Sequence, residues 1–323
     1  MCTAVSFIAQ DHYFGRNLDL EYCYQEAVTI TPRNYPFPFR IMNTISNHYA
    51  MIGIATISNQ YPLYYDAVNE MGLSMAALNF PDNAFYADPI EGMDNITPFE
   101  VIPWILGQCN CVADAITLLK NANIVAIPFS SELPLSPLHW IVADAKECIT
   151  VEAMENGIII SDNPVGILTN NPPFHYHMHH LSDFLTLSPN EPQNNFAPEL
   201  ELSTYSRGMG AIGLPGDASS ASRFIRAVFM KTHCVKPEKE AAAVGQFFHI
   251  LDSVSMVDGT VRLGNKNEKT IYSCCCNTDK GIYYYTTYEN RQISAIYLYH
   301  EDLNAKSLVS YPLLRMQQIR VEN

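Results

Sequence analysis

The fold of this chain is limited above all by the order of its strand-like and helix-like segments. Short runs rich in β-branched and aromatic residues, separated by Asn, Pro and Gly, are typical of strands. Such runs fill the chain up to about residue 90, return at 138–170, and return again at 270–299. Between them stand helix-like segments in two pairs, at roughly 98–108 and 111–122, and at 221–233 and 237–254.

Because strands and helices do not alternate one by one, a doubly wound parallel sheet is disfavoured. The order predicts an α+β fold in which two antiparallel sheets pack together with helices outside, a four-layer αββα sandwich. Hydrophobic residues make up 48% of the 323 residues, which is enough for a sizeable core. We expect one domain, residues 1–323.

Capping signals define where two of the helices should begin. Thr97 is suited to the N-cap, Pro98 to the first turn, and Glu100 completes a capping box. Ser219 or Ser220 is expected to cap the segment 221–233.

The charge and the N-terminus exclude several classes of partner. With 19 Lys+Arg against 33 Asp+Glu the formal charge is −14, and no basic cluster is present, which argues against nucleic acid. The opening segment lacks a basic region, its apolar run is broken by Gln10, Asp11 and His12, and no stretch reaches about 18 apolar residues. We expect no membrane association and a cytoplasmic protein, whose nine cysteines, an odd number, stay reduced.

Cys2 carries the strongest chemical signal. A small second residue favours removal of the initiator methionine, and Cys is small enough. Removal of Met1 would place a thiol and a free α-amine on one residue, and both groups exchange protons near neutral pH. The thiolate is a nucleophile, and an adjacent amine can serve as its base. The alternative is that position 2 is only a small residue that favours methionine removal.

Four polar residues give Cys2 a chemical context. Arg16 and Asp19 lie in the strand-like run that follows, where Arg16 would favour a neighbouring thiolate and Asp19 would hold an α-amine. Asn79 and Asn170 each end a strand-like apolar run, and their amides are suited to an oxyanion hole. The alternative readings are a surface ion pair and two turn-forming asparagines.

Six segments together resemble the choloylglycine hydrolase family, and within it the conjugated bile salt hydrolases of gut bacteria. The segments are MCTAVSF, YFGRNLD, NEMGLSMAALNFP, ILTNNP, GLPGDASSASRF and EKTIYSCCCNTDKGIYYYTTYEN. They cover nearly the whole chain in the family's order. The resemblance implies an N-terminal-nucleophile hydrolase, usually a homotetramer, that cleaves glycine or taurine from conjugated bile salts without metal or cofactor.

The resemblance also assigns roles to residues. Six positions match the catalytic site of the family: Cys2, the nucleophile, with Arg16, Asp19, Asn79, Asn170 and Arg223. Four positions match the walls of the steroid pocket: Leu18, Tyr65, Phe129 and Leu133. Penicillin V acylase, the related enzyme, typically carries Tyr at the position of Asn79, which favours bile salts here. The four residues matched to the steroid pocket are equally compatible with positions in the hydrophobic core.

Two alternative functions are also compatible with these residues. The same Cys2 chemistry would serve a penicillin V acylase or another hydrophobic-amide acylase, and a non-enzyme alternative is a thiol redox or small-molecule-binding protein.

The GxGxxG run at 208–213 lacks a following helix, so a nucleotide site is disfavoured. Residues 171–217 are expected to form a loop, in which the four histidines of 175–180 form a solvated cluster and not a metal site.

Overall fold

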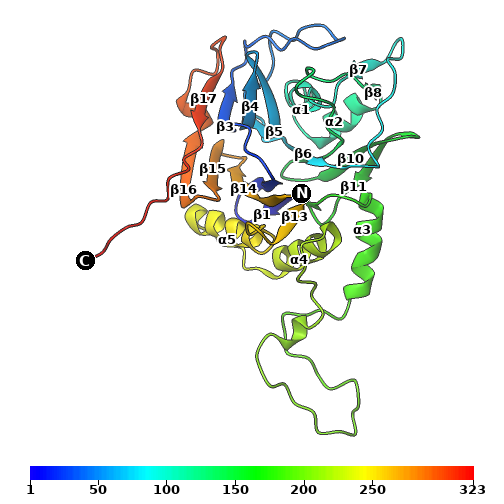
Figure 1. Ribbon diagram of the computed structural model, residues 1–323, viewed down its shortest axis with the longest axis vertical. Coiled ribbons are helices and arrows are strands. Elements are labelled where there is room, and N and C mark those ends of the chain that lie inside the picture. Colours follow the sequence, from blue (N-terminus) through cyan, green and yellow to red (C-terminus); the bar gives the residue numbers. More distant parts are fainter.

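Two large antiparallel sheets form the centre of the protein, as seen in the computed structural model, which describes residues 1–323 (Figure 1). The first sheet has the strand order β12-β1-β2-β14-β15-β16, and β13 pairs with β14 at its edge. Its strands are β1 (Cys2–Ile8), β2 (His12–Leu20), β12 (Ile167–Leu168), β13 (Val261–Leu263), β14 (Lys266–Asn277), β15 (Ile282–Thr287) and β16 (Asn290–Tyr297).

The second sheet has eight strands in the order β11-β10-β9-β6-β5-β4-β3-β17. Its strands are β3 (Ala27–Thr31), β4 (Met51–Ser58), β5 (Tyr61–Asn69), β6 (Ser74–Asn79), β9 (Leu138–Ala143), β10 (Cys148–Met154), β11 (Gly157–Asp162) and β17 (Val309–Pro312). A separate pair of short parallel strands, β7 (Asp94–Ile96) and β8 (Ala122–Ile124), lies beside it.

Helices cover the outer face of each sheet. Helix α1 (Val101–Leu106), followed by α2 (Val112–Leu119), packs on β5 and β6. Helices α4 (Ser220–His233) and α5 (Glu240–Asp252) pack on β1, β2, β12 and β14 of the first sheet, and β1 and β2 contact β6 across the interior. The predicted αββα sandwich is therefore confirmed (Figure 1).

Strand β2 lies between two covering layers, which explains its composition. All of its residues except Leu20 are buried, so Arg16 and Asp19 lie inside the protein. Gly15 is required here because a Cβ atom would lie 1.9 Å from the carbonyl oxygen of Cys274 on β14. The close approach of β14 therefore depends on a residue without a side chain.

The expected helix starts are confirmed in one case and shifted in the other. Ser219 caps α4 and accepts a hydrogen bond from the Ser222 main-chain N–H. Helix α1, by contrast, begins at Val101 and not at Pro98. The Glu100 carboxylate does accept the Thr97 N–H at 3.0 Å, but the Thr97 hydroxyl has no partner, so half of the capping box is present without the first helical turn.

Residues 171–217 differ from the expected loop. They include helix α3 (Phe174–His180) and two short 3₁₀ turns, η1 (Leu181–Phe184) and η2 (Met209–Ala211). Between these turns the chain forms an arm that extends away from both sheets (Figure 1). A hydrogen bond between the Ser188 N–H and the Gly210 carbonyl closes its base at 2.9 Å.

Candidate active site

Cys2 begins β1 and lies at the wall of a cavity. It pairs with Leu18 on β2, and only 3% of its surface is exposed. The cavity has a volume of about 390 Å³, and Arg16 and Asn79 line it together with Cys2. Three of the six predicted catalytic residues therefore meet at one surface.

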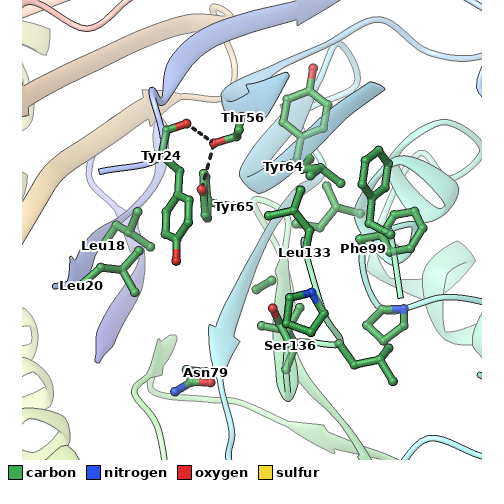
Figure 2. A pocket seen from close by; sticks show the side chains of 18 of the residues that line it. Leu18, Leu20, Tyr24, Thr56, Tyr64, Tyr65, Asn79, Phe99, Leu133 and Ser136 are labelled. Atoms are coloured by element: carbon green, nitrogen blue, oxygen red, sulfur yellow. Dashed lines mark hydrogen bonds between the residues drawn. The ribbon is translucent and has the colours of Figure 1, made fainter. Parts of the chain in front are cut away.

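The cavity is mainly apolar. Fourteen of its 22 lining residues are hydrophobic, and all four predicted wall residues are among them: Leu18, Tyr65, Phe129 and Leu133. Figure 2 shows three of the four, Leu18, Tyr65 and Leu133. Such a cavity suits a rigid apolar ligand, since binding would bury much of the ligand's surface.

One wall is formed by residues 128–136, which Arg40 holds in place. The Arg40 guanidinium donates to the Phe129 carbonyl at 2.6 Å and lies over the rings of Phe99 and Phe129, 5.5 and 5.2 Å from their centres. The two rings pack edge to face. The position of this wall thus depends on a cation–π contact outside the cavity.

Tyr65 places a hydroxyl group beside the apolar walls. Its hydroxyl donates to Thr56 Oγ1 at 2.9 Å, and the Thr56 hydroxyl donates to the Tyr24 carbonyl at 3.1 Å (Figure 2). Burial raises the pKa of Tyr65, so the phenol remains neutral.

Arg16 is completely buried, and one of its donor nitrogens is free. Its Nη1 donates to the carbonyls of Tyr65 and Ala77 at 2.9 and 2.5 Å, whereas Nη2 has no partner. Burial by itself lowers the pKa of Arg16, but the anionic forms of neighbouring groups, Cys2 foremost, raise it by more, so its net pKa lies above the usual value. Arg16 therefore places a permanent positive charge at the cavity wall.

Asp19 is buried on β2 and has one free acceptor atom. Its Oδ1 accepts the Thr270 hydroxyl at 2.6 Å, while Oδ2 has no partner. Burial raises the pKa of Asp19, and the nearby Arg223 opposes this shift. The Asp19 main-chain carbonyl accepts the α-amine of Met1 at 2.8 Å.

Asn170 and Arg223 hold the main chain of Cys2. The Asn170 Oδ1 atom accepts the Cys2 N–H at 2.9 Å and Arg223 Nη2 at 2.7 Å. Arg223 Nη1 donates to the Cys2 carbonyl at 2.5 Å, and Asn170 Nδ2 donates to the Asn79 carbonyl at 2.7 Å. The Asn170 side chain therefore connects β1, α4 and β6 at one point.

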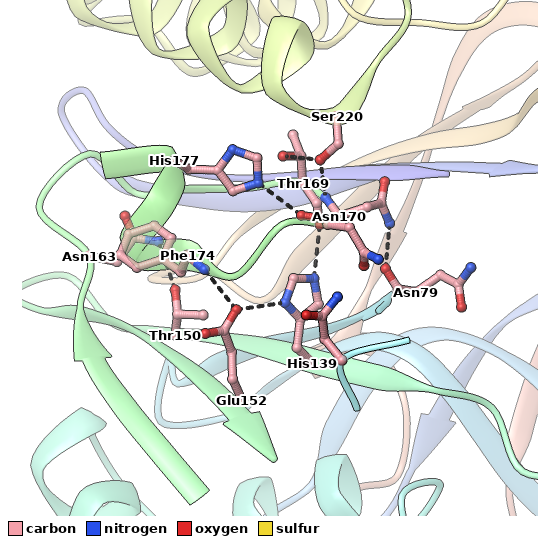
Figure 3. Close-up of polar contacts among 12 residues, drawn as sticks. Asn79, His139, Thr150, Glu152, Asn163, Thr169, Asn170, Phe174, His177 and Ser220 are labelled. Atoms are coloured by element: carbon pink, nitrogen blue, oxygen red, sulfur yellow. Dashed lines mark hydrogen bonds and ion pairs between the residues drawn. The ribbon is translucent and has the colours of Figure 1, made fainter. Parts of the chain in front are cut away.

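Three buried residues next to Asn170 were not predicted. His139 and Glu152 come from β9 and β10, and His177 comes from α3 (Figure 3). Treating all four histidines of 175–180 as solvated was wrong for His177, which is 1% exposed and contacts the Asn170 carbonyl at 2.9 Å. The spacing of Phe174 and His177 places both on the buried face of one helix.

The protein contains no cluster of three or more His, Cys, Asp or Glu side chains placed to bind a metal. Its helices are all too short or too polar to cross a bilayer. All nine cysteines are free thiols, and Cys274, Cys275 and Cys276 are fully buried in β14.

Known proteins share this sequence and architecture. Residues 2–311 match the linear amide C–N hydrolases of the choloylglycine hydrolase family. A bile salt hydrolase/transferase of Lactiplantibacillus plantarum is 51% identical over 314 residues, which is 97% of each chain. A bile salt hydrolase/transferase of Clostridium perfringens is 38% identical over 321 residues, 96% of each chain.

Solved structures extend the comparison to the fold. A crystal structure of a mutant conjugated bile acid hydrolase from Clostridium perfringens superposes with a TM-score of 0.94 at 36% identity, covering 100% of both chains. Penicillin V acylase from Agrobacterium tumefaciens superposes with a TM-score of 0.77 at 17% identity, covering 96% of this chain and 90% of the other. At that identity the second likeness concerns the fold alone.

Proposed function

The chain belongs to the choloylglycine hydrolase family of linear amide C–N hydrolases, and we propose that it cleaves conjugated bile salts with Cys2 as the nucleophile. The observation that carries this proposal is the position of Cys2. Cys2 lies at the wall of a mainly apolar cavity of about 390 Å³, beside the buried positive charge of Arg16. The scissile amide of a steroid conjugate would therefore meet the sulfur of Cys2 and the guanidinium of Arg16.

The reaction has two covalent steps. The Cys2 thiolate attacks the carbonyl carbon of the amide, the C–N bond breaks, and the bile acyl group remains as a thioester. The Cys2 α-amine relays the thiol's proton to the leaving nitrogen, so glycine or taurine departs as the free amine. Water then attacks the thioester and gives a proton to the same amine, which releases the bile acid and restores the thiol.

This role of the α-amine requires that Met1 be removed. With Met1 attached, the Cys2 nitrogen is a peptide N–H, which is not basic, and it donates to Asn170. The buried Oδ2 atom of Asp19 lacks a partner, and a free ammonium or amine on Cys2 is the donor we assign to it. Asp19 and Asn170 would then hold the amine from two sides.

The oxyanion that forms during attack needs donors at the cavity wall. Asn79 ends β6 and exposes its side chain there, so we assign its amide as one donor (Figure 2). The second N–H of Asn170 Nδ2 and nearby main-chain N–H groups complete the set. Removal of one such donor typically lowers the rate about 10²–10³-fold.

The steroid would lie against Leu18, Tyr65, Phe129 and Leu133. A rigid ring system gains most of its binding free energy from apolar area removed from water, about 25 cal/mol per Å². No metal or cofactor takes part in this scheme.

The first experiment measures amine release from glycocholate, taurocholate and penicillin V at equal concentrations. The protein's N-terminus is confirmed by mass beforehand. We expect rapid release from both bile salts, slow release from penicillin V, and none from Cys2→Ala. Cys234→Ala, which removes another free thiol, is the matched control and should keep full activity. Faster release from penicillin V would assign the protein to the acylases, and turnover by Cys2→Ala would refute the mechanism.

We further propose that the protein is a cytoplasmic homotetramer built from one-domain subunits. The arm between η1 and η2 supports assembly, because it exposes Leu185, Phe196 and Tyr205, whose surfaces are 84%, 92% and 85% accessible. Large apolar side chains exposed on one projecting segment are typical of contact surfaces. Nine free thiols are typical of a reducing compartment.

A further inference from the structure

The main chain at Thr169 and Asn170 is held by hydrogen bonds from three other elements (Figure 3). His139 Nε2 lies 3.0 Å from the Thr169 carbonyl oxygen, and His177 Nε2 lies 2.9 Å from the Asn170 carbonyl oxygen. On the side of α4, the Asn170 N–H donates to Ser220 Oγ at 2.8 Å, and the Ser220 hydroxyl donates to Thr169 Oγ1 at 2.9 Å. The turn after β12 is therefore fixed from β9, α3 and α4.

His139 and Glu152 act as one buried unit. The Nδ1 atom of His139 lies 3.3 Å from Glu152 Oε1, which also accepts the Phe174 N–H at 2.9 Å. The two ring nitrogens of His139 therefore face oxygen atoms on opposite sides, Thr169 on one and Glu152 on the other. Glu152 in this way links His139 to the first residue of α3.

His177 is held in a single protonation state. Burial lowers the pKa of His177 to about 4, so the ring is neutral near pH 7. A carbonyl oxygen can only accept, which places the ring proton on Nε2. The ring stacks on Phe224 with the centres 4.7 Å apart, and Phe224 follows Arg223 in α4. His177 therefore contacts both elements that carry the side-chain partners of Cys2.

We infer that His177 and the His139–Glu152 pair are positioning residues of the amide hydrolysis, which hold Asn170 where its side chain receives the nitrogen of Cys2. This inference rests on the proposed function and extends it beyond the six matched residues. The Asn170 amide contacts Cys2, Arg223 and the Asn79 carbonyl at once. A shift of the Asn170 main chain would disturb all three contacts. A displacement of about 1 Å at a reacting group can lower the rate about 10²-fold.

The test compares His177→Phe with His177→Gln and with His179→Phe. Phe retains the ring that stacks on Phe224 but removes the donor to Asn170, whereas Gln retains an N–H donor. His179 lies on the same helix and is exposed, so its substitution is the matched control. For glycocholate hydrolysis we expect kcat to fall about 10²-fold in His177→Phe with KM changed less than about threefold. We expect partial recovery in His177→Gln and no change in His179→Phe.

The pH profile separates positioning from a general loss of folded protein. Loss of active molecules lowers kcat/KM by the same factor at every pH, whereas a displaced Cys2 amine shifts the acid limb of the profile. We expect this limb to shift in His177→Phe. A folded His177→Phe protein with the kcat and pH profile of the unsubstituted protein would overturn the inference.

A second variant covers the case in which His177→Phe does not fold. Glu152→Gln retains the shape of the side chain and its acceptor for Phe174, but it removes the carboxylate that faces His139 Nδ1. We expect kcat to fall at least about tenfold in Glu152→Gln at little change in KM. Unchanged kcat would overturn the inference here as well.

The rate at which iodoacetamide alkylates Cys2, followed by mass spectrometry, reports on the position of the thiol without requiring turnover. We expect the rate at Cys2 to change at least about tenfold in His177→Phe, with the rate at the exposed Cys23 unchanged. If the unsubstituted protein hydrolysed no bile salt, the proposed function would fail, and this alkylation rate would still decide whether His177 positions the Cys2 residue. An unchanged rate at Cys2 would refute that role.

Discussion

Asn170 accepts the main-chain N–H of Cys2 on its side-chain oxygen at 2.9 Å, although 168 positions separate the two residues in sequence. The same oxygen also accepts Arg223, which in turn donates to the Cys2 carbonyl. The peptide groups on both sides of the Cys2 Cα atom are therefore fixed. Rotation about its side-chain bond is the main freedom left to the thiol.

Replacement of Asn170 by Ala should lower kcat about 10²–10³-fold, because the Cys2 nitrogen and the oxyanion each lose a partner. The measurement is steady-state glycocholate hydrolysis by protein of confirmed N-terminus. Asn156→Ala, in the exposed turn between β10 and β11, is the control and should retain normal kinetics. Activity of Asn170→Ala within a few-fold of normal would remove Asn170 from the mechanism.

Replacement of Phe129 by Ala should raise KM for bile salts roughly tenfold and leave kcat within about threefold. The lost apolar contact corresponds to about 1–2 kcal/mol of ligand binding, and Phe129 does not contact the reacting atoms in the proposed mechanism. Phe85→Ala removes an exposed ring, 47% accessible, and serves as the control. A fall in kcat at constant KM would contradict the assignment of Phe129 to the steroid wall.

Replacement of Tyr272 by Phe should lower the free energy of unfolding by about 1–3 kcal/mol. The Tyr272 hydroxyl donates to the buried Asp66 carboxylate at 2.6 Å, and Tyr283 donates to its other oxygen. Burial takes the Asp66 carboxylate out of water and raises its pKa. Because water cannot replace a lost donor there, each one that is removed leaves the carboxylate with one hydrogen bond fewer. Urea denaturation gives the value, and Tyr22→Phe, at a ring that is 44% accessible, should change it by less than about 0.5 kcal/mol.

Stability should fall as the pH decreases from about 6.5 to about 4, in part because of His12. Burial lowers the pKa of His12 from 6.5 to about 4. The unfolded chain therefore binds a proton within this window that the folded protein excludes, a contribution on the order of 3 kcal/mol. Urea denaturation at pH 7 and pH 4.5 should show a smaller loss in His12→Gln than in the unsubstituted protein. Equal losses would mean that His12 is protonated in the folded state.

Replacement of Phe196 and Tyr205 by Ser should dissociate the proposed tetramer. Both residues are exposed and neither lines the cavity, so the subunits should stay folded. The arm that carries them projects away from both sheets (Figure 1). Sedimentation velocity measures the change in mass. A tetramer that persists, or an unsubstituted protein that is monomeric, would show that the arm does not mediate assembly.

Much of the site could be predicted because its residues sit in locally recognisable patterns. Arg16 and Asp19 belong to a run that the sequence identifies as a strand, and Cys2 is defined by its position alone. The wall residues Phe129 and Leu133 lie in an irregular segment, and only the resemblance to a family pointed to them. No feature of the sequence indicated that Arg40 would contact this segment.

The helix that carries His177 shows where prediction failed. The Pro-, Asn- and Gly-rich composition of 171–217 favours a loop, and α3 has only seven residues, too few for a clear amphipathic pattern. Packing of Phe174 and His177 against Phe224 stabilises it instead. That contact joins segments about 50 positions apart in the chain.

The sequence by itself determined the layered architecture, the thiol at position 2 and the charged residues of β2, because strand periodicity and residue type act over a few neighbours. Only the tertiary structure decided which buried groups meet around Asn170, and which donors and acceptors there stay free. Those outcomes depend on how two sheets and two helices pack. The cost of burying an unpaired polar group then selects one arrangement from many that the local sequence allows.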